Sequence, residues 1–140
     1  MVTHPGGVCV AALTDQNELL FVKQFRYPYN EVVTELPAGK LELGEDPLES
    51  ARRELLEETG AAASEIHSLG VMYPTPGYCG EVIHLYWAKG LTFSALSLDE
   101  DEFLEPAVIP LDKAVQMALS GELKDAKTLI CILKLNEMLQ

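Results

Sequence analysis

Acidic side chains gather in one stretch of the sequence, residues 39–61. Its second half places an arginine and three glutamates close together, Arg53, Glu54, Glu57 and Glu58. Carboxylates at such density repel one another unless a cation lies among them. Hard divalent cations such as Mg²⁺ take oxygen ligands, usually one or two carboxylates together with substrate phosphates. The stretch therefore predicts a metal site for phosphate chemistry.

A helix is expected to position these carboxylates. Asp46 can cap its N-terminus, Pro47 suits its first position and Gly60 can end it. Within such a helix Glu54 and Glu58 are four residues apart, so their side chains lie on one face. The spacing therefore predicts two neighbouring carboxylates that can share a metal ion.

The arginine in the same helix has a predicted partner. Arg53 and Glu57 are also four residues apart, and an ion pair between them would orient the glutamate and limit the repulsion among the carboxylates. The alternative is an exposed acidic helix whose ion pairs only face solvent. The ordered spacing of glycines, glutamates and arginine over residues 39–61 favours the metal site.

The rest of the sequence predicts strands and helices that do not alternate strictly. A polar turn at residues 14–17 predicts that the first two strands form a hairpin, and residues 37–39 are expected to break regular structure. The pattern indicates an α/β sandwich around a mixed β-sheet, in a single domain that covers residues 1–140. The expected strands are Val8–Leu13, Glu18–Arg26, Glu31–Leu36, Ile66–Tyr73, Glu81–Ala88 and Ala107–Ile109, and the further helices are Lys113–Ser120 and Lys127–Leu139, the latter capped by Asp125.

The composition argues against several classes of protein. The formal net charge of −12 should repel nucleic acid backbones and anionic membranes, and no run of about 18 apolar residues predicts a membrane span. Residues 1–10 lack the pattern of a signal peptide, and three widely spaced cysteines fit unpaired thiols. We therefore expect a cytoplasmic protein that binds neither nucleic acid nor membranes.

The stretch at residues 39–61 resembles the Nudix box, G-x5-E-x7-R-E-U-x-E-E-x-G-U, in which U is a bulky apolar residue. The fixed positions all match, and they are Gly39, Glu45, Arg53, Glu54, Glu57, Glu58 and Gly60; Leu55 fills the first apolar position and the smaller Ala61 fills the last. The resemblance implies a Nudix hydrolase with an α/β/α sandwich fold. Such enzymes use Mg²⁺ (or Mn²⁺) to hydrolyse a nucleoside diphosphate linked to another group.

The resemblance also assigns roles within the box. It implies that the metal is bound by Glu54, Glu57 and Glu58 and by the backbone carbonyl of Ala38. It further implies that Glu57, Glu58 and Arg53 take part in catalysis.

Stretches outside the box resemble the ADP-ribose pyrophosphatase branch of the family. They are residues 21–28, 35–40, 75–81 and 121–128. By that resemblance Arg26 contacts the diphosphate or the terminal ribose, and Glu81 contacts the ribose or supports the metal site. Lys40 is assigned to the same substrate site. Taken without the resemblance, Arg26 could equally be a surface arginine at the end of a strand.

A second acidic cluster, residues 99–102, lies in a predicted loop. Taken alone, it fits a solvated acidic loop. In this branch a loop at the same place supplies the glutamate that activates water or completes the metal shell. The resemblance therefore assigns Glu100 as the general base and associates Glu102 with the metal.

The motif and its flanks together predict Mg²⁺-dependent hydrolysis of ADP-ribose or a related nucleoside diphosphate sugar, giving AMP and ribose 5-phosphate. The alternatives are another nucleoside diphosphate substrate, or a Nudix module that senses a nucleotide without cleaving it. Members of the branch usually carry further N-terminal strands, which help to build a homodimer and to bind adenosine. These strands are expected to be absent here, and a homodimer is kept as an expectation.

Overall fold

The first of two sheets has four strands and mixed direction. The computed structural model describes residues 4–94 and 106–140, which leaves the predicted site residues Glu100 and Glu102 outside the described part. In the order β4-β1-β6-β5, β1 pairs antiparallel with β4 and parallel with β6, and β5 pairs antiparallel with β6. The strands are β1 (Gly7–Ala12), β4 (Ala38–Lys40), β5 (Ala61–Met72) and β6 (Ile83–Phe93).

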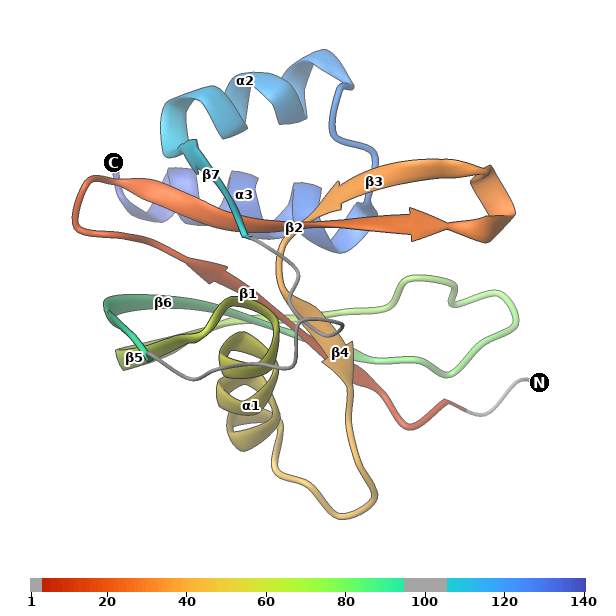
Figure 1. Ribbon diagram of the computed structural model, residues 1–140. Coiled ribbons are helices and arrows are strands. Elements are labelled where there is room, and N and C mark those ends of the chain that lie inside the picture. The colour runs from red at the N-terminus through yellow and green to blue at the C-terminus, as the bar shows by residue number, and fades with distance from the viewer. Residues whose placement is uncertain (1–3, 95–105) are drawn as a thin grey trace.

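The second sheet has three strands, all antiparallel, in the order β3-β2-β7. Its strands are β2 (Glu18–Arg26), β3 (Glu31–Glu35) and β7 (Ala107–Pro110). A 3₁₀ turn at Tyr27–Tyr29 joins β2 to β3, and the resulting hairpin extends past the ends of its neighbours (Figure 1). This hairpin forms one wall of the cleft described below.

Helices cover both faces of the four-stranded sheet, which confirms the predicted α/β/α sandwich. Helix α1 (Pro47–Thr59) lies on one face and α3 (Ala126–Met138) on the other, while α2 (Leu111–Ser120) packs against α3 and against β2 and β7 of the second sheet (Figure 1). Alternate side chains of β1 point to opposite faces. Val10 packs in a cluster with Leu55 of α1, while Ala11 packs in a cluster with Ile132 of α3. None of the helices in the described ranges is long and apolar enough to span a membrane.

The predicted helix ends in the acidic stretch are confirmed. The Asp46 carboxylate accepts a hydrogen bond from the backbone N–H of Glu49, with Pro47 in the first turn. At the other end Gly60 adopts φ +75°, a left-handed conformation that glycine reaches without a steric penalty. The Asp125 cap of α3 is confirmed in the same way, since its carboxylate accepts from the N–H of Thr128.

Three predictions about the strands are wrong. The turn after β1 exists, but the strands on either side share only one isolated bridge, between Leu13 and Leu19, and then enter different sheets. Their predicted hairpin fails because β1 finds its long-range partners in β4 and β6. Residues 37–39 were expected to break regular structure, yet two of them belong to β4 (Ala38–Lys40), which pairs with β1 where Gly7 lets the two backbones approach closely. Moreover, β5 begins five residues earlier than predicted, at Ala61.

Candidate active site

A cleft of about 810 Å³ opens between the two sheets. Its walls come from β2 and β3 on one side, from β1, β4 and α1 on the other, and from the beginning of α3. Six of the residues predicted for the site line it, and they are Arg26, Ala38, Lys40, Glu54, Glu58 and Glu81. The structure thus brings together residues that lie more than fifty positions apart in the sequence.

Helix α1 supplies the acidic wall of the cleft. The carboxylate of Glu58 accepts a hydrogen bond from the backbone N–H of Ala38 at 3.2 Å, which ties the helix to β4. One turn earlier, the carboxylate of Glu54 lies against Gly39, where an added β-carbon would overlap it. A glycine at this position therefore gives Glu54 the room to face the cleft.

Arg53 lies beside the acidic wall and organises it. Its Nε and Nη2 each donate to the carboxylate of Glu45 at 2.9 Å, and its Nη1 donates to Glu54 at 2.9 Å and to Glu57 at 3.3 Å. The predicted pair with Glu57 is thus confirmed, but the bidentate pair with Glu45 is the shorter one. This guanidinium lowers the pKa of Glu45 to about 2, chiefly through its hydrogen bonds.

The two α1 carboxylates that line the cleft, Glu54 and Glu58, have an electrostatic character opposite to that of Glu45. Burial raises the pKa of Glu58 to about 7, and the negative charge of Glu54 adds to that effect. Burial also raises the pKa of Glu54, partly offset by Arg53. Two partly buried carboxylates on one helix face, each less stable as an anion, form a donor set that suits a hard divalent cation. The residues present therefore fit the predicted metal.

The third predicted metal ligand lies elsewhere. The side chain of Glu57 is 58% exposed, contacts Arg53 and does not line the cleft. Within residues 4–94 and 106–140, no three histidine, cysteine, aspartate or glutamate side chains converge on a common metal position. All three glutamates therefore stay predictions as metal ligands; Glu54 and Glu58 line the cleft, whereas Glu57 does not.

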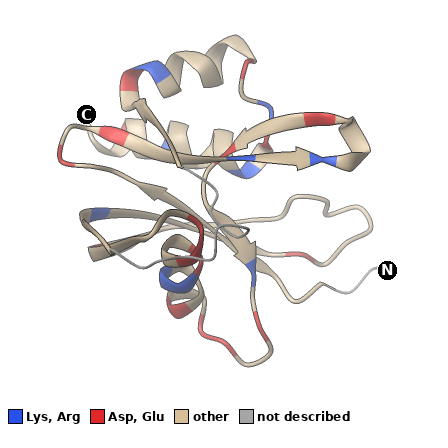
Figure 2. Ribbon diagram, viewed as in Figure 1, with Lys and Arg blue, Asp and Glu red and all other residues tan. Residues whose placement is uncertain are grey.

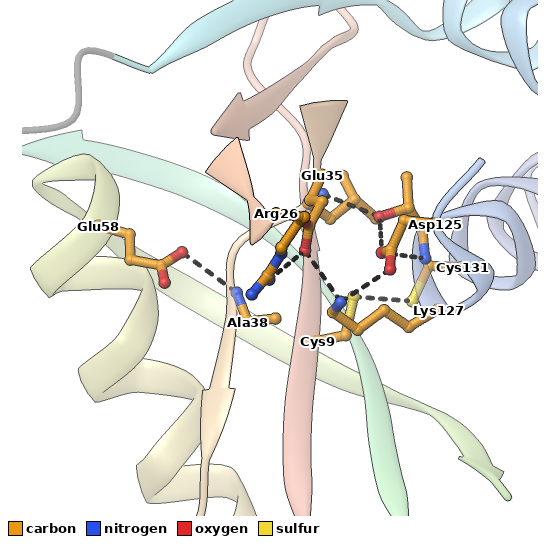
Figure 3. A network of polar contacts seen from close by, with 10 residues as sticks. Cys9, Arg26, Glu35, Ala38, Glu58, Asp125, Lys127 and Cys131 are labelled. Atoms are coloured by element: carbon orange, nitrogen blue, oxygen red, sulfur yellow. Dashed lines mark hydrogen bonds and ion pairs between the residues drawn. The ribbon is translucent and has the colours of Figure 1, made fainter. Parts of the chain in front are cut away.

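The opposite wall contains an arginine held by a buried carboxylate. Arg26 Nε lies 2.6 Å from Glu35 Oε2, and Arg26 Nη2 lies 2.7 Å from Glu35 Oε1 (Figure 3). Glu35 is only 1% exposed, and it also accepts a hydrogen bond from Lys127 Nζ at 3.0 Å. Neither Glu35 nor Lys127 was predicted from the sequence as a site residue. A charged residue directly before the apolar Leu36 was the only local signal for the buried carboxylate.

Lys40 and Glu81 also line the cleft. Glu81 lies 3.4 Å from the Nε2 of His4, a contact that the sequence did not suggest. Figure 2 shows basic residues on the outer part of β2 and at the end of β4, and acidic residues on α1. The cleft thus combines carboxylates that suit a metal ion with cations that suit a phosphate.

Comparisons with known proteins agree with this geometry. The family model described as the NUDIX domain matches residues 3–130. An ADP-ribose pyrophosphatase of Bacillus subtilis (strain 168) is 43% identical, over 100% of this chain and 78% of the relative. A Bacillus methanolicus protein named methanol dehydrogenase activator is 44% identical, with the same coverage. A solved structure of an ADP compounds hydrolase shares the fold, with a TM-score of 0.84, 22% identity and coverage of 96% of this chain and 72% of that chain.

Proposed function

Because this chain belongs to the NUDIX domain family and is a Nudix hydrolase, we propose that it hydrolyses ADP-ribose or a related nucleoside diphosphate sugar. The observation that carries the proposal is that Glu54 and Glu58 line one wall of the cleft while Arg26 lines the opposite wall. A diphosphate carries several negative charges, which a metal ion and a basic side chain can together offset. The printed name of the Bacillus subtilis relative supports ADP-ribose as the first substrate to test.

The reaction adds water across the P–O–P bridge. One phosphorus gains the oxygen of water, the other keeps the bridging oxygen, and the products from ADP-ribose are AMP and ribose 5-phosphate. Arg26 binds the diphosphate and favours the charge that develops on its oxygens. The cleft walls hold the substrate so that the diphosphate lies between β2 and α1.

The proposed cofactor is Mg²⁺, with Mn²⁺ as a substitute. Glu54, Glu58 and the carbonyl of Ala38 would hold it, with Glu57 as a further ligand by the family resemblance. Such an ion would supply Lewis-acid chemistry there: it would offset negative charge on the diphosphate and activate a water molecule for attack. Arg53 keeps Glu54 and Glu57 oriented through the contacts described above. The roles of Glu100 as base and Glu102 as a metal-associated residue remain part of this proposal.

Two further cleft residues and several expectations from the sequence complete the proposal. Glu81 and Lys40 line the cleft, which supports their assignment to the substrate site. A homodimer and a cytoplasmic location remain predictions, as does the absence of nucleic acid and membrane partners.

A substrate panel with Mg²⁺ tests the proposal. Purified protein is assayed with ADP-ribose, GDP-mannose, a dinucleoside polyphosphate and NADH, and AMP or GMP is quantified by chromatography. We expect kcat/KM to be highest for a nucleoside diphosphate sugar, and EDTA to abolish turnover. A higher kcat/KM for another member of the panel would indicate that the enzyme prefers a different Nudix substrate. Binding of ADP-ribose without turnover in Mg²⁺ or Mn²⁺ would instead support a nucleotide sensor.

A further inference from the structure

Four charged side chains form a chain of contacts at the end of the cleft opposite the acidic wall (Figure 3). Arg26 comes from β2, Glu35 from β3, and Asp125 and Lys127 from the beginning of α3. Lys127 Nζ lies 3.0 Å from Glu35 Oε1 and 3.0 Å from Asp125 Oδ1. The order of contacts is therefore arginine, glutamate, lysine, aspartate.

The backbone closes the network from the other side. The hydroxyl of Thr128 donates to the carboxylate of Asp125 at 2.6 Å and accepts from the N–H of Leu36 at 3.0 Å. Leu36 follows Glu35 directly, so α3 is tied to the end of β3 through both the backbone and the side chains. A displacement of Lys127 would change the position of the Glu35 carboxylate, because the two side chains are in direct contact.

The contacts of Glu35 decide how Arg26 faces the cleft. A guanidinium has five N–H donors, arranged along two edges that can each bind an oxyanion. Glu35 occupies the edge formed by Nε and Nη2. The other edge, formed by Nη1 and the second hydrogen of Nη2, is left to donate to a phosphate. The carboxylate thus selects which edge of Arg26 a substrate can use.

We propose that Lys127 is a positioning residue for substrate binding, which acts by holding Glu35 so that Glu35 orients Arg26 toward the diphosphate. This inference rests on the proposed function. Lys127 lines the cleft, but the proposal does not require it to touch the substrate, because its ammonium already contacts two carboxylates and its side chain is only 16% exposed. Without it, Glu35 and Asp125 would compete for Arg26, the nearest remaining cation of the network.

Steady-state kinetics of Lys127→Met test the inference, with Lys134→Met as the matched control. Lys134 is exposed, belongs to the same helix and forms no ion pair with any described residue. For ADP-ribose we expect Lys127→Met to raise KM about 10-fold, in the range that outer partners of functional side chains contribute, and to leave kcat within about 2-fold. Lys134→Met is expected to keep both constants. An unchanged KM in Lys127→Met, in a wild type that turns over ADP-ribose, would overturn the inference and leave the proposed function intact.

A double-mutant cycle separates positioning from direct contact. If Lys127 acts through Arg26, adding Lys127→Met to an Arg26→Met variant should change KM by less than about 2-fold. Independent, multiplicative effects of the two substitutions would overturn the inference. The cycle therefore asks whether the lysine works through the arginine.

An NMR measurement decides the inference without turnover. The Nε–H of Arg26 is bonded to Glu35, and we expect its exchange with water to accelerate in Lys127→Met but not in Lys134→Met. Equal exchange in the two variants would overturn the inference. If the wild type hydrolyses none of the nucleotides in the panel, the proposed function fails, and this signal alone decides whether Lys127 positions Arg26.

Discussion

The carboxylate of Glu54 lies so close to Gly39 that the β-carbon of any other residue would overlap it. This contact joins β4 to α1 at the floor of the cleft. It explains in physical terms why a glycine begins the acidic stretch, because a side chain there would push Glu54 away from the position in which it can bind a metal.

Gly39→Ala should therefore damage activity more than stability. We expect kcat/KM for ADP-ribose to fall on the order of 100-fold, since the added methyl group must displace Glu54, a carboxylate proposed to bind the metal. Gly77→Ala is the control, because a β-carbon at Gly77 meets open space. Equal activity of the two variants would show that Glu54 need not occupy its observed position.

Arg53→Lys should lower activity with little effect on folding. A lysine ammonium cannot reproduce the contacts that the guanidinium makes with Glu45, Glu54 and Glu57. We expect kcat to fall about 10- to 100-fold while the Tm stays within a few degrees. The adjacent Arg52→Lys serves as control, since Arg52 is exposed and donates only to the backbone carbonyl of Ala63 among the described residues. A kcat equal to that of the control would show that Arg53 has no role in catalysis.

Glu35→Gln should destabilise the fold in a pH-dependent manner. Burial alone would raise the pKa of Glu35, but the hydrogen bonds and charges of Arg26 and Lys127 outweigh it and leave the pKa below its ordinary value of 4.5. A lowered pKa contributes stability above pH 4.5 that is lost as the pH falls through the folded-state pKa. We expect a cost of about 3 kcal/mol at pH 7, because the two cations lose their buried partner.

Urea unfolding of wild type and Glu35→Gln at pH 7 and at pH 3.5 measures that dependence. The difference in unfolding free energy should shrink at the lower pH, where the wild-type carboxylate begins to bind a proton. A difference that stays constant, or that grows on acidification, would contradict the lowered pKa.

Asp125→Ala should cost more stability than the equivalent change at the other capped helix. Asp125 accepts from both the N–H and the hydroxyl of Thr128 and also pairs with Lys127, whereas Asp46 makes one exposed contact of 3.4 Å with Glu49. We expect about 2 kcal/mol for Asp125→Ala and about 0.5–1 kcal/mol for Asp46→Ala. Thermal unfolding of the two variants makes the comparison, and the reverse order would argue against a structural role for the network at α3.

Local signals in the sequence predicted the acidic wall of the site well. The caps Asp46 and Gly60 act within one helix, and the four-residue spacing of Glu54 and Glu58 fixes their common face. Such features depend only on neighbours along the chain, so they can be predicted from the sequence alone.

Contacts between distant segments were not predictable in the same way. Glu35 and Lys127 are 92 positions apart, and no local pattern links them. The hairpin of the first two strands was predicted because its turn is local, but sheet pairing is decided by long-range partners, and β1 pairs with β4 and β6 instead. The start of β5 was missed for the same reason, since three alanines favour a strand only when β6 lies beside them.

The most direct test of the proposed chemistry compares two glutamates of the same helix. AMP release from ADP-ribose with saturating Mg²⁺ is measured for the wild type, Glu58→Gln and Glu49→Gln, with folding checked by circular dichroism. Each substitution replaces one carboxyl group of α1 by an amide, but Glu58 lines the cleft while Glu49 is exposed at the first turn. We predict a loss of kcat/KM on the order of 100-fold or more for Glu58→Gln and less than about 2-fold for Glu49→Gln. Full activity of a folded Glu58→Gln variant would contradict the assignment of this cleft as the site of diphosphate hydrolysis.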